Sequence, residues 1–175
     1  MFTDEDGNTR FYDNEVDDYK QDHYQLLWNE KLNNNWSTNM ALNYTYGRGF
    51  FEQYKEDEDF GDYNSTPIEI GGETINSTDL IRRRWLDNDF YVANASANYK
   101  NDEINLIFGG SYSTYDGDHF GEIIWARYAS DSEIRENYYQ GNGKKNDFNV
   151  FTKATYRLNE KFSLYGDLQV RLVDY

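Results

Sequence analysis

The chain has 175 residues, a net charge of −15 and no cysteine, and 18% of its residues are aromatic. The acidic excess argues against a nucleic-acid partner, because phosphate binding needs a basic face. The lack of cysteine excludes disulfides and thiolate metal sites. No apolar run approaches the roughly 20 residues of a membrane helix, and the start, MFTDEDGNTR, lacks the charged and apolar regions of a signal peptide.

Apolar and polar residues alternate with a period of two along much of the chain. This pattern predicts β-strands, because successive side chains leave a strand on opposite faces. In chain order, the predicted strands lie within residues 23–32, 35–47, 90–100, 103–113, 147–158 and 161–173. Helical patterns with capping boxes are absent from the sequence, so we predict an all-β chain of about six long strands.

The connections between these strands are of two alternating kinds. Residues 32–36, 100–103 and 158–161 are short polar turns of the hairpin type, whereas residues 55–80 and 121–146 are long polar stretches. This order predicts an antiparallel up-and-down meander. Short turns at one end and long loops at the other are also typical of an outer-membrane β-barrel.

The length of the apolar pattern in the second strand agrees with a membrane barrel. The ten steps from Trp36 to Tyr46 cover about 33 Å. Tilted by about 40°, they span roughly 25 Å, the height of the lipid-facing band in such barrels. The alternative is a soluble antiparallel sheet with one face on a core and one in water, which predicts the same alternation but shorter strands.

We therefore expect the odd-numbered and even-numbered residues of each strand to face different surroundings. We expect the apolar parity to face lipid: Trp36, Leu42, Tyr44, Tyr91, Leu106, Phe108, Val150 and Leu168. We expect the opposite parity, with the arginines before Trp85, to face a wet lumen and to supply candidates for substrate contact: His23, Asn29, Asn43, Arg82, Arg84, Asn94, Lys153, Arg157, Asp167 and Arg171.

No pattern of catalytic, cofactor-binding or metal-ligating residues is found in the sequence, so no enzyme is predicted. His23 and His119 lack companions at ligand spacing, and DGDHFGE (116–122) lacks most of a calcium-loop series. The motif RRRW (82–85) is the sharpest feature, because arginines bind carboxylates or phosphates bidentately and Trp85 offers a stacking face. The alternative, which we favour, is that these arginines pair with neighbouring acids.

Residues 11–56, 82–130 and 147–171 together resemble the barrel of a TonB-dependent receptor of the Bacteroidetes type. The segments WLDNDFY (85–91) and YDGDHFGEIIWA (115–126) carry the most specific part of the likeness. The resemblance implies a bacterial outer-membrane transporter, plugged by an N-terminal domain and energised through TonB. Its cargo would be a scarce nutrient such as a siderophore, haem, cobalamin or a glycan.

The sequence departs from that family in what it lacks. There is no plug domain, TonB box or signal peptide, and six strands are fewer than a bacterial barrel needs. We therefore expect residues 1–175 to be an internal fragment of a transmembrane barrel, which associates with lipid or, in isolation, with itself. The alternative function is a soluble β-rich surface or carbohydrate-binding protein.

Overall fold

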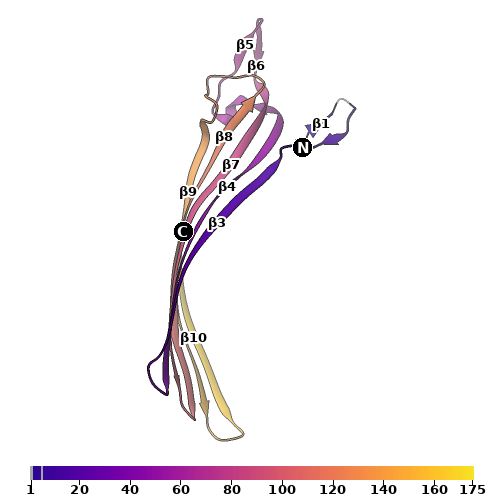
Figure 1. The fold of residues 1–175 in the computed structure, drawn as a ribbon. Coiled ribbons are helices and arrows are strands. Elements are labelled where there is room, and N and C mark those ends of the chain that lie inside the picture. Colours follow the sequence, from indigo (N-terminus) through magenta and orange to yellow (C-terminus); the bar gives the residue numbers. More distant parts are fainter. Residues whose placement is uncertain (1, 5) are drawn as a thin grey trace. The chain divides into compact units, whose positions relative to one another are not determined.

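The structure is a computed structural model that describes residues 2–4 and 6–175. It is all-β: the long strands form one sheet of six in the order β10-β9-β8-β7-β4-β3 (Figure 1). This order confirms the predicted antiparallel meander, because strands that follow one another in the chain lie beside one another in the sheet. The long strands are β3 (Val16–Lys31), β4 (Trp36–Asp59), β7 (Ser77–Lys100), β8 (Ile104–Ala126), β9 (Asn137–Arg157) and β10 (Ser163–Asp174).

The long strands extend well into the regions that the sequence predicts as loops. Of the two polar stretches, 55–80 and 121–146, only residues 60–76 and 127–136 lie outside the long strands. That part of the prediction is wrong, because loss of the apolar alternation was taken as the end of a strand. Backbone hydrogen bonds to both neighbours can continue a strand where neither face needs an apolar side chain.

Short strands and a short helix lie outside the six long strands. Two short hairpins, β1 (Phe2–Thr3) with β2 (Thr9–Arg10) and β5 (Ile68–Ile70) with β6 (Glu73–Ile75), were not predicted. The β5–β6 turn uses Gly71 and Gly72 at φ of 64° and 89°, the left-handed region that glycine tolerates best. A short 3₁₀ helix, η1 (Phe60–Tyr63), follows β4. In the described part of the chain, no helix is long and apolar enough to cross a membrane.

The three short turns share one local structure, built around an asparagine. Asn33 accepts hydrogen bonds from the backbone N–H of Asn35 and Trp36, at 2.9 Å each. Asn101 and Asn159 accept equivalent bonds from the amides two and three residues further on. Asparagine favours this geometry because its side chain can stand in for a backbone carbonyl. The short polar turns are therefore hairpin turns, as predicted.

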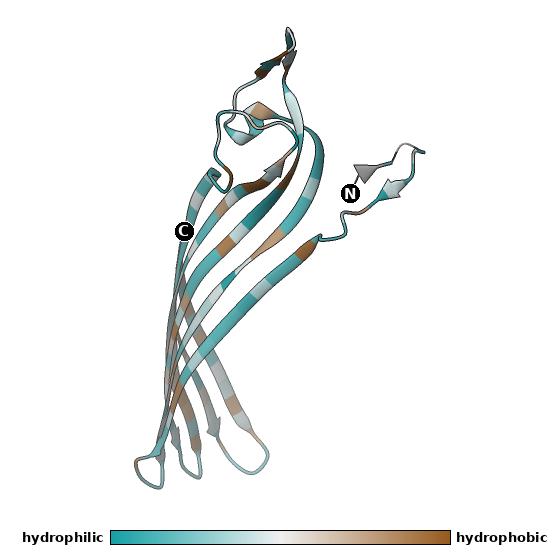
Figure 2. Ribbon diagram, turned by 45° about the horizontal axis from the view of Figure 1, so that its top comes forward, coloured by the Kyte–Doolittle hydropathy of each residue, from teal (hydrophilic) through white to brown (hydrophobic). Residues whose placement is uncertain are grey.

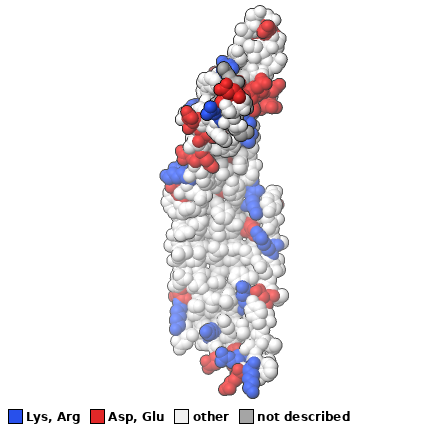
Figure 3. All heavy atoms as spheres, turned by 90° about the vertical axis from the view of Figure 1, so that its right-hand side faces the viewer, with Lys and Arg blue, Asp and Glu red and all other residues white. Residues whose placement is uncertain are grey.

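The residues of the chain group into two compact units. Unit 1 comprises Met1–Lys20, Gly47–Asp87 and Gly117–Asn142, and unit 2 comprises Gln21–Tyr46, Asn88–Asp116 and Gly143–Tyr175. Hydropathy changes from residue to residue along the strands (Figure 2). On the side shown in Figure 3, long stretches of surface carry neither acidic nor basic side chains.

In unit 2, the two parities of the strands make different kinds of contact. The rings of Tyr24, Tyr44 and Tyr91 stack in a row, with centroids 5.8 and 4.6 Å apart. On the opposite parity, polar side chains bond across the strands: His23 with Thr45, Gln25 with Asn43, Asn39 with Ser96, and Asn149 with Ser111. We call these the apolar face and the polar face.

Unit 1 contains the one cluster of buried apolar side chains among the described residues. Leu80 is only 1% exposed and packs with Tyr63, Ile123 and Tyr138. Tyr63 belongs to η1, so this cluster attaches the segment after β4 to strands β7, β8 and β9. Unit 1 also contains stacked aromatic rings, such as Trp85 with Phe120, and ion pairs, such as Arg83 with Glu52.

Candidate functional site

A cavity of about 500 Å³ in unit 1 combines aromatic rings with one exposed arginine. Arg84 on β7 lies within it, and strands on both sides supply its neighbours. Its other lining residues include Asp17, Tyr19, Phe51, His119 and Tyr139. Ligand sites in proteins occupy about 300–1,000 Å³ and combine aromatic walls with a few polar groups. We call this cavity the Arg84 pocket.

Glycines on the neighbouring strands make room for the tyrosines around this pocket. A Cβ on Gly49 would lie 2.1 Å from the Asp18 carbonyl oxygen and 2.9 Å from the Tyr19 ring. A Cβ on Gly121 would lie within 2.5 Å of the rings of Tyr138 and Tyr139. Glycine within a strand often marks such a close approach. Any larger residue at these positions would displace the rings.

The guanidinium of Arg84 has aromatic neighbours and no carboxylate partner. It lies 5.9 Å from the centroid of the Phe51 ring, within the range of a cation–π contact. The Tyr138 hydroxyl is close enough to interact with its charge. Within the described part of the chain, no carboxylate oxygen comes within 4 Å of Arg84, and Asp17, which also lines the pocket, lies beyond that distance.

Arg82 lies two residues earlier on the same parity of β7 and is bound mainly to neutral groups. It donates to the Tyr63 hydroxyl at 2.9 Å and to Gln53 at 3.2 Å. The Tyr63 hydroxyl in turn donates to Glu58, so Arg82 reaches a carboxylate only through Tyr63. Burial, followed by this bond to Glu58, raises the pKa of the Tyr63 hydroxyl above its usual value.

Two buried polar atoms beside these arginines have no hydrogen-bond partner: the Nε of Arg82 and the hydroxyl of Tyr138. A buried polar atom left unpaired costs about 1–3 kcal/mol. The two arginines add a smaller cost, because side chains two residues apart on a strand are separated by about 7 Å. At that distance two positive charges repel by about 0.6 kcal/mol in water. A bound anion could therefore accept hydrogen bonds in this region and offset the repulsion between the two arginines.

Arg83, on the opposite parity, behaves differently. It forms an ion pair with Glu52 at 2.8 Å and lies 4.1 Å above the Phe50 ring. Trp85 donates its indole N–H to Glu122 at 3.0 Å. The interpretation that the RRRW arginines pair with neighbouring acids is therefore right for Arg83 and wrong for Arg82 and Arg84.

The structure does not gather the ten candidate substrate residues into one cluster. Arg82 and Arg84 belong to unit 1 and the other eight to unit 2. Within unit 2, five candidates have side-chain contacts: His23 and Asn43 both hydrogen-bond Thr45, the candidates Lys153 and Asp167 lie 3.8 Å apart, and Arg171 pairs with Asp147. Asn29 and Arg157 are exposed, and Asn94 lines a different hollow.

Sequence reasoning missed most of the aromatic neighbours of Arg84. Strand parity could have found Phe51, because it is odd-numbered whereas the apolar residues of β4 from Trp36 to Tyr46 are even-numbered. Tyr63 and Tyr138 lie in stretches taken as loops, so no periodic pattern pointed to them. His119 was considered only as a metal ligand.

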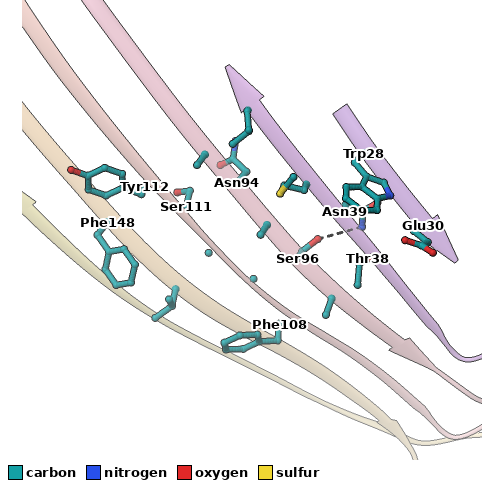
Figure 4. Close-up of a pocket in the computed structure, with 18 residues that line it drawn as sticks. Trp28, Glu30, Thr38, Asn39, Asn94, Ser96, Phe108, Ser111, Tyr112 and Phe148 are labelled. Atoms are coloured by element: carbon teal, nitrogen blue, oxygen red, sulfur yellow. Dashed lines mark hydrogen bonds between the residues drawn. The ribbon is translucent and has the colours of Figure 1, made fainter. Parts of the chain in front are cut away.

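The hollow in unit 2, shown in Figure 4, has a different character. Its volume is about 670 Å³, and small residues form its floor: Ala93, Ala95, Ala97 and Gly110. Larger apolar side chains surround it, among them Phe108, which is 59% exposed. Three of the residues predicted to face lipid, Leu42, Phe108 and Val150, line this hollow. We call it the apolar trough.

The other residues predicted to face lipid also make apolar or aromatic contacts or remain exposed. The ring of Trp36 lies 5.1 Å from that of Tyr99, and Tyr44 stacks on Tyr91. Leu168 on β10 is 75% exposed, and Leu106 on β8 is half-buried. The apolar face of unit 2 therefore presents large side chains that no other part of the described chain covers.

The described residues contain no group of three or more His, Asp or Glu side chains placed to hold a metal ion. The aromatic rings and the guanidinium that line the Arg84 pocket are groups that can bind a ligand. No family model, curated protein or solved structure matches the chain.

Proposed function

We propose that this chain forms part of the wall of a bacterial outer-membrane β-barrel, in a TonB-dependent receptor that imports a scarce nutrient. The observation that carries the proposal is the apolar face of unit 2. Large side chains on it are strongly exposed, including Leu26 at 60% and Leu168 at 75%. Contiguous apolar patches beyond a few hundred Å² mark interaction surfaces, and a lipid bilayer supplies a partner along the whole face.

The dimensions of the strands support the same proposal. A membrane β-strand needs about 9–11 residues, whereas β4 and β7 have 24 residues each. Globular strands usually have about 3–10 residues. Strands of this length cross a bilayer with residues left over for the water on one side. The polar face, with its hydrogen-bonded Asn, Ser and Thr side chains, suits a wet lumen.

The import role rests on the resemblance of residues 11–56, 82–130 and 147–171 to TonB-dependent receptors and on the Arg84 pocket as a place for cargo. In the complete receptor the partners would be outer-membrane lipid, the plug domain, TonB and the nutrient. A siderophore, haem, cobalamin or a glycan all remain candidates for that nutrient.

Detergent dependence tests the membrane assignment. The 20.8 kDa chain is refolded into detergent micelles and into plain buffer, and each sample is analysed by sedimentation velocity. We expect a folded, homogeneous species in detergent and self-associated or aggregated protein in plain buffer. Flotation with phospholipid vesicles provides the matched positive control. A stable 20.8 kDa monomer in plain buffer would contradict the proposal.

A second candidate is a soluble carbohydrate-binding protein. The observation in its favour is a hollow of about 420 Å³ in which Tyr24, Tyr44 and Tyr91 lie near Gln25 and Asn43. Aromatic rings beside amide groups could bind the apolar and polar sides of a sugar. This candidate predicts a detergent-independent monomer whose tyrosine fluorescence changes with added oligosaccharide.

A further inference from the structure

The arginines of this acidic chain differ in whether they pair with an acidic side chain. The chain has 32 acidic and 17 basic residues, so a carboxylate is usually within reach of an arginine. Ion pairs with Asp or Glu are formed by Arg10, Arg83, Arg127, Arg135 and Arg171. Among the described residues, Arg82, Arg84 and Arg157 form no such pair, and of these three Arg84 lines the Arg84 pocket.

The groups around Arg84 also suit a bound anion. Arg82, on the same parity, brings a second positive charge whose Nε–H is buried and unpaired. The Tyr138 hydroxyl, in a residue only 9% exposed, is a further unpaired donor. An oxyanion beside Arg84 would receive a charge-assisted bond from its guanidinium and would reduce the repulsion between the two arginines.

The walls of the pocket favour a flat ring next to that oxyanion. Phe51, Tyr19 and Tyr139 present aromatic rings around Arg84, and strand glycines hold the tyrosines close. Aromatic rings stack on one another and on guanidinium planes. The net charge of −15 would repel anions that make no specific contacts. A ligand with both a ring and an oxyanion satisfies the two kinds of lining group together.

We infer that the Arg84 pocket binds a small dissolved ligand that joins a carboxylate or phosphate to a flat ring, with Arg84 as its main anchor. On β7, Arg84 and the acid-paired Arg83 have opposite parities, and Trp85 also lines the pocket. Binding requires only the pocket. The role of the ligand as cargo rests on the proposed function.

The probes for this inference are chosen to separate charge from ring. The full chain in detergent micelles is titrated with benzene-1,3,5-tricarboxylate, whose charge keeps it out of micelles, and binding is measured by ligand-observed NMR. Propane-1,2,3-tricarboxylate keeps the charges without the ring, and benzene-1,3,5-trimethanol keeps the ring without the charges. Phenyl phosphate tests the phosphate form of the oxyanion.

We expect an aromatic oxyanion, the tricarboxylate or phenyl phosphate, to bind more tightly than the two reduced probes. Arg84→Gln should weaken that binding at least tenfold, because it removes a charge-assisted bond. Arg84→Lys should weaken it less, since it keeps the charge and loses the bidentate fork. Arg127→Gln is the matched control, as it removes an acid-paired arginine of the same unit and should change binding less than twofold.

The inference would be overturned if neither aromatic oxyanion bound, if the neutral ring bound equally well, or if Arg84→Gln bound as the wild type does. Far-UV circular dichroism of each variant shows that the sheet is retained. Failure here is distinguishable from failure of the proposed function. A chain that enters vesicles but binds no probe refutes the anion site alone, and a monomer in plain buffer that binds the probe refutes the membrane role alone.

Discussion

Replacing one alanine of the apolar trough by arginine distinguishes a lipid-facing sheet from a water-facing one. Ala95 and Asn94 are neighbours on β7, both are exposed, and their side chains leave the strand on opposite faces. In a protein surrounded by water, Arg at either exposed position should change stability by no more than about 0.5 kcal/mol. The comparison therefore reports on the solvent at each face and not on packing.

A lipid environment makes the two substitutions unequal. Arginine on the lipid face near the bilayer midplane costs about 2–4 kcal/mol, whereas a lumen arginine stays hydrated. Ala95 lines the apolar trough together with Gly110 and Phe108. We expect Ala95→Arg to lower the free energy of unfolding by about 2–4 kcal/mol and Asn94→Arg by less than about 0.5 kcal/mol.

The assay is urea unfolding of the chain refolded in phospholipid vesicles, followed by tryptophan fluorescence and checked for reversibility. Leu106→Arg and Asn105→Arg on β8 repeat the comparison on a second strand. Equal losses at the two faces, or a larger loss for Asn94→Arg, would refute the assignment of the apolar face to lipid.

Three further predictions concern local structure. Gly49→Ala should destabilise the chain by about 1–3 kcal/mol, because its Cβ would meet the backbone of β3, whereas Gly141→Ala, with nothing within 4 Å, should be neutral in the same denaturant titration. Asn101→Ala should cost about 1 kcal/mol through the lost turn bonds, and unchanged stability would refute that role for the side chain. Hydrogen bonds from Ser130 and from the Thr66 amide lower the pKa of Asp131 below its ordinary 3.8, so the stability they give is present above 3.8 and is lost as the pH falls through the lower, folded pKa. An NMR titration of the Thr66 amide should show a midpoint below 3.8, and one at or above 3.8 would contradict the assignment.

The sequence was most informative where side chains alternate strictly. Residues 35–47 and 93–100 show this alternation most clearly, and they belong to the adjacent strands β4 and β7. Alternation encodes a strand because one face needs apolar side chains while the other needs polar ones. The stacked tyrosines and the cross-strand polar hydrogen bonds of unit 2 lie on opposite parities, as this alternation predicts.

The sequence was least informative where strands continue without that contrast. Residues 121–126 and 137–146 belong to β8 and β9, although both were taken as part of a loop. There, backbone pairing with neighbouring strands maintains the extended conformation, and such pairing leaves no period in hydropathy. The Arg84 pocket depends on this region, because its lining residue Tyr139 comes from it. From the sequence we favoured acid pairing over an anion site for the arginines of RRRW, and the structure shows such a pair for Arg83 and none for Arg84.

The most direct test of the central claim is to measure which solvent meets each face. Single cysteines at successive positions of β8 from Ile104 to Tyr112 are spin-labelled in the vesicle-reconstituted chain, and their accessibility to oxygen and to a water-soluble nickel chelate is measured. Oxygen concentrates in lipid and the chelate in water. We predict that even-numbered positions favour oxygen and odd-numbered positions favour the chelate, with a period of two. Chelate accessibility at Leu106 and Phe108 equal to that at Asn105 and Ile107 would contradict a sheet with one face in lipid.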